Sequence, residues 1–272
     1  MGNGIAHVFA LKGFETTLVE ANADLAAKAA ATISKNLDRQ AAKGTISAAE
    51  KDAALKRLKT ATSPAEAGGF QFAVEAVSEK LELKKTIFRA LDAAAAPDAI
   101  LATNTSSLPI TEIAAAVKDP SRVIGMHFMN PVPVMKLVEI IRAQQTSDET
   151  FAAVDALAKT LGKTPACAKD FPGFVSNRVL MPMINEAIYC LMEGVSSRED
   201  IDQIMKLGMA HPMGPLQLAD YIGLDVCLAI MGVLHEGYAD SKYRPCPLLK
   251  QMVQAGRLGV KSGGGFYDYP RR

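Results

Sequence analysis

The sequence predicts an α/β domain with a doubly wound parallel sheet at residues 1–168, followed by an all-helical domain at residues 169–272. Three observations support this. Strand-like and helix-like segments alternate between residues 70 and 168, which is typical of a parallel sheet covered by helices. An acidic residue, Glu20, follows a glycine-led helix and a strand at the distance typical of nucleotide-binding units. Beyond residue 169 only helical patterns, caps and breakers occur.

The first segment, MGNGIAHVFALKGFETTLVE, predicts a helix, a turn and a strand. Its apolar residues recur at helical spacing until Gly13, and residues 16–19 form a strand-like stretch that ends at Glu20. In a dinucleotide-binding unit, the acid that binds the ribose lies about 20 residues beyond the glycine turn, and Glu20 stands at about that distance from Gly2. Since the complete glycine fingerprint is absent, an amphipathic helix packed on a sheet of any kind remains an alternative.

The amino-acid composition limits which kinds of binding partner are expected. The chain has 272 residues, with 30 basic and 29 acidic ones, so no overall charge favours nucleic acid or an anionic membrane. A small-molecule substrate is the expected partner. We expect a cytoplasmic protein with free thiols, because no leader or long apolar span is evident and the four cysteines show no C-x-x-C spacing. The four histidines form no ligand motif, so no metal site is expected.

An alanine-rich region at residues 24–59 predicts a helical hairpin inserted into the α/β pattern. It is interrupted at residues 43–45 and restarts at Ser47, with Glu50 three positions later, which is a capping box. Three cations share one face of the first arm: Lys35, Arg39 and Lys43. This stripe is explained equally well by a solvated surface and by phosphate binding.

The alternating part of the chain follows the hairpin. Strands are predicted at residues 72–77, 99–103, 122–128, 137–141 and 164–168. Helices are predicted at residues 81–95, 109–117 and 148–161. Ligands are expected at the carboxyl ends of these strands.

The stretch GMHFMNPVPVMKLVEII carries the most informative polar residues. His127 stands near the end of one strand, and Glu139 lies within the next, flanked by apolar residues. A buried carboxylate needs a partner, and a histidine oriented by a carboxylate is suited to act as a general base near neutral pH. The alternative is a structural His127, with Glu139 facing solvent from an edge strand.

Two further stretches contain polar residues that are candidates for binding. In ATNTSSLPI, Ser106 or Ser107 can cap the next helix, or Ser106 can meet a ligand at the end of its strand. In DFPGFVSNRVL, Asn177 interrupts an apolar helix face, so it faces either solvent or a cleft between domains.

Taken in order and spacing, these stretches resemble the 3-hydroxyacyl-CoA dehydrogenase family. The resemblance also includes VEAVSEKLELKKTIF, MKLGMAHPMGPLQLADYIGLD and GGGFYDY, covers essentially the whole chain, and is most specific in HFMNPVPVMKLVE. The chain looks most like the stand-alone, short-chain 3-hydroxybutyryl-CoA dehydrogenases. A Rossmann-type NAD-binding domain is implied, followed by an all-helical domain for dimerisation and substrate binding.

The resemblance also implies roles for individual residues. His127 is the base that takes the proton of the 3-hydroxyl group, Glu139 orients it, and Ser106 and Asn177 bind substrate oxygens. Glu20 binds the adenosine ribose, which favours NAD over NADP because its charge would repel a 2′-phosphate. Further cofactor contacts are expected at Gly2, Glu79, Lys84, Asn130 and Lys261. Lys43 would contact the coenzyme A end of an acyl-CoA substrate, and the helical domain would form a homodimer.

The chain departs from the family pattern at its start. The first strand and the first two glycines of the fingerprint would precede Met1. We therefore expect a chain that is truncated at its N-terminus, folds poorly as written and binds NAD weakly or not at all. Two alternatives stay open: a related two-domain hydroxy-acid dehydrogenase that does not use CoA esters, and a catalytically impaired, crystallin-like relative. Acyl chain length and physiological direction are left open by the sequence.

Overall fold

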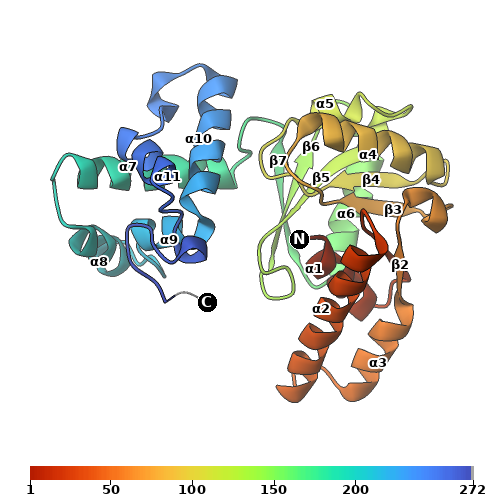
Figure 1. Ribbon diagram of the computed structural model, residues 1–272. Helices are drawn as coiled ribbons and strands as arrows, with labels where there is room; N and C mark the ends of the chain where they lie inside the picture. Colours follow the sequence, from red (N-terminus) through yellow and green to blue (C-terminus); the bar gives the residue numbers. More distant parts are fainter. Residues whose placement is uncertain (271–272) are drawn as a thin grey trace. The chain divides into compact units, whose positions relative to one another are not determined.

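The computed structural model describes residues 1–270 and divides into two compact units, Met1–Asp170 and Phe171 onward (Figure 1). The helices are α1 (Gly2–Leu11), α2 (Ala23–Ala42), α3 (Ala48–Arg57), α4 (Leu81–Ala94), α5 (Ile110–Ala114), α6 (Asp148–Thr160), α7 (Ser176–Met192), α8 (Arg198–Gly208), α9 (Pro215–Ile222), α10 (Leu224–Tyr238) and α11 (Pro247–Gln254). The strands are β1 (Thr16–Val19), β2 (Leu58–Ala61), β3 (Phe72–Glu75), β4 (Ile100–Thr103), β5 (Val123–Phe128), β6 (Leu137–Arg142) and β7 (Thr164–Lys169). The α/β character of the first unit and the helical character of the second confirm the predicted fold class.

The strands of the first unit form two sheets. β1 pairs with β2 in a two-stranded parallel sheet, and the other five strands form a sheet in the order β3-β4-β5-β6-β7. All its neighbours are parallel except β5 and β6, which are antiparallel. An entirely parallel sheet was predicted, and that is wrong at this pair. The reason is the connection at residues 129–136, which contains no helix and folds the chain straight back.

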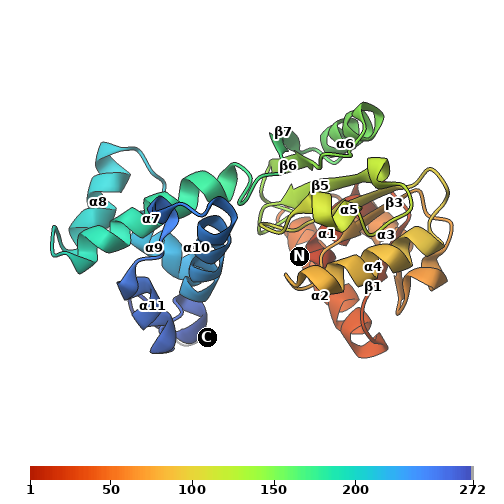
Figure 2. The ribbon, with the colours of Figure 1, turned by 90° about the horizontal axis from the view of Figure 1, so that it is seen from above.

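Helices cover both faces of the five-stranded sheet. Apolar residues of α1 and α6 pack with Ile124, Met126 and Phe128 of β5 on one face. On the other face, a Cβ at Gly125 would overlap Ile110 at the start of α5, so glycine is required for this close approach. Figure 2 shows α4 and α6 on opposite sides of this sheet. Because strand side chains alternate, His127 shares the α5 face with Gly125.

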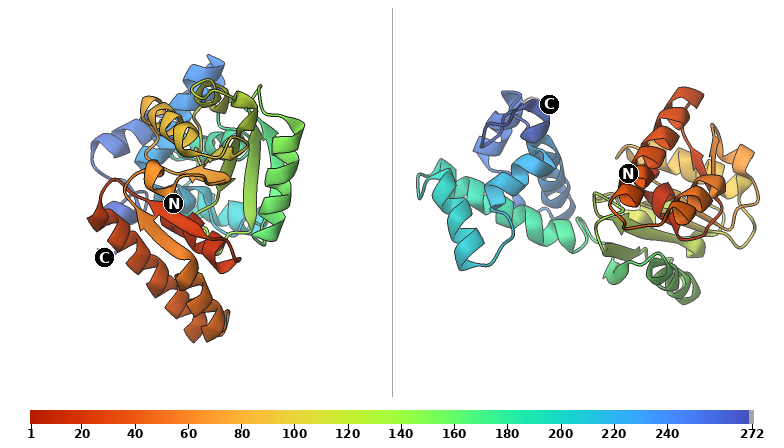
Figure 3. Two further views of the ribbon diagram at one scale, coloured as in Figure 1. Left: turned by 90° about the vertical axis from the view of Figure 1, so that its right-hand side faces the viewer. Right: turned by 90° about the horizontal axis from the view of Figure 1, so that it is seen from below.

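The predicted helical hairpin is confirmed as α2 and α3, which lie side by side (Figures 1 and 3). The capping box is present, with Glu50 N–H donating to Ser47 Oγ at 3.1 Å and Ser47 N–H donating to Glu50 Oε2 at 2.7 Å. Ile33 and Leu37 of α2 are buried against α1. The chain after α3 was predicted to continue as helix to residue 59, but it enters β2 at Leu58.

The second unit packs its helices around an apolar core that includes Leu216, Leu224 and Leu234. Two buried aspartates connect residues 266 and 267 to this core. Asp202 accepts hydrogen bonds from Leu216 N–H and Tyr267 Oη, at 2.8 and 2.9 Å. Asp220 accepts from Phe266 N–H and Tyr267 N–H, both at 2.9 Å. These bonds hold Phe266 and Tyr267 against α8 and α9.

Among the described residues, no single helix combines the length and apolar composition needed to cross a membrane. α9 and α10 together would pass that test on length and composition, but they are bent by 97° at their junction.

Candidate active site

His127 and Glu139 form a buried pair on the five-stranded sheet. They stand opposite each other in the antiparallel register of β5 and β6, and His127 Nδ1 lies 3.1 Å from Glu139 Oε2. The two residues are only 9% and 4% exposed. β6 lies between β5 and β7, so the alternative of a solvent-facing Glu139 on an edge strand is wrong.

This contact determines how the imidazole can be used. An ionised carboxylate only accepts hydrogen bonds, so in the neutral histidine Nδ1 carries the hydrogen and Nε2 carries the lone pair. The carboxylate also stabilises the imidazolium that forms when Nε2 takes a proton. The pair is therefore suited to general acid–base chemistry through Nε2.

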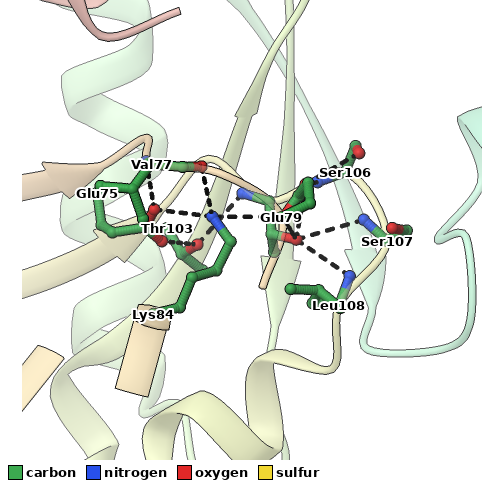
Figure 4. Close-up of polar contacts among 9 residues, drawn as sticks. Glu75, Val77, Glu79, Lys84, Thr103, Ser106, Ser107 and Leu108 are labelled. Carbon is green, nitrogen blue, oxygen red and sulfur yellow. Dashed lines mark hydrogen bonds and ion pairs between the residues drawn. The ribbon is translucent and has the colours of Figure 1, made fainter. Parts of the chain in front are cut away.

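Ser106 lies in the loop after β4 and is held by a carboxylate from the loop after β3 (Figure 4). Its N–H and its Oγ donate to Glu79 Oε1, at 2.7 and 3.0 Å. Thr105 Oγ1 also donates to Glu79 and accepts from the N–H groups of Ser107 and Leu108. The alternative in which Ser106 or Ser107 caps the next helix is wrong, because a proline occupies the N-cap position of α5, and Thr105 Oγ1 accepts from N–H groups of the turn before this helix.

Glu79 is in turn linked to a buried ion pair (Figure 4). Lys84 Nζ lies 2.7 Å from Glu75 Oε1 and 3.3 Å from Glu79 Oε2. Thr103 Oγ1 donates to the other oxygen of Glu75 at 2.7 Å. Glu79 and Lys84 were expected from the family resemblance. Glu75 and Thr103 were not expected, since a glutamate at a strand end carries no signal of its partner nine residues away.

The loop after β5 is fixed by a buried lysine. Lys163 is 9% exposed, and its Nζ donates to the carbonyl oxygens of Val132 and Met135, at 2.5 and 2.8 Å. Burial lowers the pKa of Lys163, with a smaller contribution from Lys12. Asn130 is exposed on this same loop. Sequence reasoning missed Lys163, which resembles any lysine between a helix and a strand.

The start of α1 and the ends of the strands lie at one edge of the first unit. A Cβ at Gly2 would lie 3.9 Å from that of Ala76, directly after β3, and one at Gly4 would lie 3.1 Å from that of Val132. Glu20 directly follows β1. A helix N-terminus suits a pyrophosphate and an acid after the strand suits a ribose, so these residues fit a dinucleotide.

Three further predicted site residues lie on other elements of the chain. Lys43 is exposed and ends α2, at the tip of the hairpin. Asn177 lies in the first turn of α7 and is 8% exposed, so the solvent-facing alternative is wrong. Lys261 forms an ion pair with Asp225 in the second unit. Their roles in binding stay predictions.

Comparison with known proteins places the chain among dehydrogenases. Residues 1–171 match the family model described as 3-hydroxyacyl-CoA dehydrogenase, NAD binding domain, and residues 173–269 match that of the C-terminal domain.

Individual relatives are similar over nearly their whole length. The chain is 55% identical over 272 residues to the probable 3-hydroxybutyryl-CoA dehydrogenase of Bacillus subtilis, covering 100% of this chain and 95% of the relative. It is 54% identical to the 3-hydroxybutyryl-CoA dehydrogenase of Bradyrhizobium diazoefficiens, covering 99% and 92%. The crystal structure of the (S)-3-hydroxybutyryl-CoA dehydrogenase of Ralstonia eutropha superposes with a TM-score of 0.97 at 49% identity, covering 100% and 96%.

Proposed function

The chain belongs to the 3-hydroxyacyl-CoA dehydrogenase family, and we propose that it interconverts (S)-3-hydroxybutyryl-CoA and acetoacetyl-CoA with NAD, using His127 as its general base. The family activity is the interconversion of 3-hydroxyacyl-CoA and 3-oxoacyl-CoA with NAD. The observation that carries the assignment of the base is the buried contact of 3.1 Å between His127 Nδ1 and Glu139 Oε2.

Proton transfer is the step that these residues perform. In the oxidation direction, Nε2 of His127 accepts the proton of the 3-hydroxyl group, and Glu139 stabilises the resulting imidazolium. In the reduction direction, the same nitrogen returns the proton to the oxygen at C3. NAD, when bound, supplies the nicotinamide that accepts or donates the hydride at C3. Neither residue needs to move between the two directions.

Substrate and cofactor positioning is proposed for the remaining residues. Ser106 and Asn177 bind substrate oxygens, which holds C3 within reach of base and nicotinamide. Glu20 binds the adenosine ribose. Gly2, Glu79, Lys84, Asn130 and Lys261 are the other proposed cofactor contacts. Lys43, exposed at the tip of the hairpin, is proposed to contact a phosphate of coenzyme A.

The proposed homodimer is supported by apolar side chains that the second unit leaves exposed. Helices α7 and α8 and the turns after them expose Val179 (67%), Val195 (70%), Ile204 (57%), Leu207 (76%) and Met209 (61%). Exposed apolar residues in such number on one small unit favour a protein partner, and a second copy is the occupant that we propose. Light scattering after size exclusion should give twice the chain mass; a monomer would contradict this proposal.

Turnover is the direct test of the function. Purified protein is mixed with NADH and acetoacetyl-CoA, and the loss of NADH absorbance is followed for the wild type and His127→Gln. In a preparation that binds NADH, we expect turnover by the wild type. Because a positioned base contributes about 10²- to 10⁴-fold, we expect a loss of that size in the variant. Free acetoacetate serves as a second substrate. Equal turnover of acetoacetate would favour the hydroxy-acid dehydrogenase, and absence of turnover with intact NADH binding would favour a catalytically impaired relative.

A further inference from the structure

Glu75 is a buried carboxylate that none of the roles above uses. It is the last residue of β3 and is 3% exposed. Oε1 accepts from Val77 N–H at 2.6 Å and from Lys84 Nζ at 2.7 Å, and Oε2 accepts from Thr103 Oγ1 at 2.7 Å. Both oxygens are thus engaged inside the domain, so Glu75 acts on other residues and not directly on a ligand.

Its effect is passed on by Lys84. This lysine is 1% exposed, and its ammonium lies between the buried carboxylate of Glu75 and the half-exposed one of Glu79. It also donates to Val77 O at 3.2 Å. A buried cation needs a counter-ion, and Glu75 provides the closer one. The ammonium is therefore fixed in a position 3.3 Å from Oε2 of Glu79 (Figure 4).

Glu79 is the last member of this chain of contacts before Ser106. Its side chain is 39% exposed, so without partners it would sample several rotamers. Lys84 attracts Oε2, Ser106 N–H and Oγ donate to Oε1, and Thr105 Oγ1 lies within hydrogen-bond distance of both oxygens. Together these contacts set the orientation of the carboxylate. The carboxyl ends of β3 and β4 are joined in this way at the proposed substrate-binding serine.

We propose that Glu75 is a positioning residue of the dehydrogenase, acting through Lys84 and Glu79 to hold Ser106 in place for the substrate. The charge of Glu75 is what matters. If Glu75 is neutral, Glu79 becomes the only carboxylate beside a buried ammonium, and Lys84 draws it away from Ser106. The proposal rests on the proposed function at one point, the role of Ser106 in substrate binding.

The first test needs no substrate. Glu75→Gln keeps the shape of the side chain and removes its charge. Hydrogen exchange is followed in peptides that contain Ser106, whose N–H donates to Glu79 at 2.7 Å. We expect this amide to exchange about 10-fold faster in Glu75→Gln, because its hydrogen-bond acceptor has moved. Unchanged exchange would overturn the proposal, whether or not the protein is a dehydrogenase.

A matched control is available in the same unit. Asp92 is a buried carboxylate that accepts from Arg122 at 2.6 Å, and Arg122 also donates to Ala99 O at the amino end of β4. Asp92→Asn removes one charge of a buried pair at the opposite end of the strand. We expect it to lower the melting temperature without changing hydrogen exchange at Ser106 or the KM for acetoacetyl-CoA. An effect on either equal to that of Glu75→Gln would contradict a specific route through Lys84.

The second test uses kinetics. We expect Glu75→Gln to raise the KM for acetoacetyl-CoA about 10-fold, with a smaller change in kcat, as loss of substrate positioning predicts. In a double-mutant cycle, Glu75→Gln is combined with Ser106→Ala. The two effects on kcat/KM should be far less than multiplicative, because Glu75 acts through Ser106. Fully multiplicative effects would overturn the route through Ser106. If the wild type shows no turnover, the proposed function fails. Hydrogen exchange at Ser106 then still tests whether Glu75 positions Ser106.

A second variant covers the case in which Glu75→Gln does not fold. The double variant Glu75→Met with Lys84→Met replaces the buried pair by apolar side chains, an exchange that proteins often tolerate. It removes the ammonium that orients Glu79, so faster exchange at Ser106 is expected in a well-folded chain. Unchanged exchange in this variant would likewise overturn the proposal.

Discussion

His127 and Glu139 face each other across the antiparallel strands β5 and β6, with Nδ1 of the histidine 3.1 Å from Oε2 of the glutamate. Their pairing depends on the loop at residues 129–136, which sets the register of the two strands. A shift of one residue would turn one of the two side chains to the opposite face of the sheet. Register thus links a backbone feature directly to the proposed chemistry.

Glu139→Gln tests this relationship. The amide keeps the size of the side chain but no longer stabilises an imidazolium or fixes the tautomer, so we expect kcat to fall by about 10²- to 10³-fold. The dissociation constant of NADH should stay unchanged, as measured by fluorescence titration. Glu149→Gln, an exposed change on α6, is the control and should keep wild-type rates. A Glu139→Gln enzyme with nearly wild-type kcat would exclude Glu139 as the orienting carboxylate.

The pairing of His127 with Glu139 could be predicted from the sequence, because both residues interrupt strongly apolar strands and a buried charge requires a partner. β2 was missed for a physical reason. Its four residues, Leu58–Ala61, follow a helix directly and gain strand structure only by pairing with β1. Glu75 was missed because its counter-ion, Lys84, lies in a lysine-rich stretch that also suits a solvated helix face. Only tertiary contacts distinguish the buried lysine from its exposed neighbours.

Glu20→Ala tests the choice of cofactor. Glu20 follows β1, where a carboxylate can accept from ribose hydroxyls and repel a 2′-phosphate. A hydrogen bond to a charged group contributes about 1.5–3 kcal/mol, so we expect the preference for NADH over NADPH in kcat/KM to fall roughly 10- to 100-fold. Asp24→Ala, in the first turn of α2, is the control and should keep the wild-type preference. If Glu20→Ala also keeps the wild-type preference for NADH over NADPH, Glu20 does not bind the ribose.

Lys163→Met tests the anchoring of the loop that carries Asn130. The variant leaves the carbonyl oxygens of Val132 and Met135 without their buried donor, and we expect the free energy of unfolding to fall by about 1–3 kcal/mol. If Asn130 contacts the cofactor, the KM for NADH should rise as well, about 10-fold. The control is Lys159→Met on α6, whose ion pair with Asp155 is largely exposed and contributes at most about 1 kcal/mol. A loss of stability without any change in this KM would separate the loop from cofactor binding.

We expect His7 to make the stability of the first unit sensitive to acid. It is fully buried in α1, where Nε2 lies 3.2 Å from Gln40 Oε1. Among the described residues, Nδ1 has no hydrogen-bond partner. Burial lowers the pKa of His7 from the ordinary value of 6.5; the bond to Gln40 opposes this shift, and the charge of Lys163 adds to it. The folded chain therefore favours the neutral imidazole.

The pH dependence follows from this direction. Well above pH 6.5, His7 is neutral in both the folded and the unfolded chain and contributes no slope. Below pH 6.5 the unfolded chain binds a proton that the folded chain does not, so stability falls as the pH falls toward the folded pKa, by at most about 1.4 kcal/mol per pH unit. His7→Gln retains an amide that can bond to Gln40 and does not titrate. Melting temperatures measured from pH 7.5 to 5 should therefore decline less steeply in His7→Gln than in the wild type. Parallel declines would show that protonation of His7 does not contribute to acid unfolding.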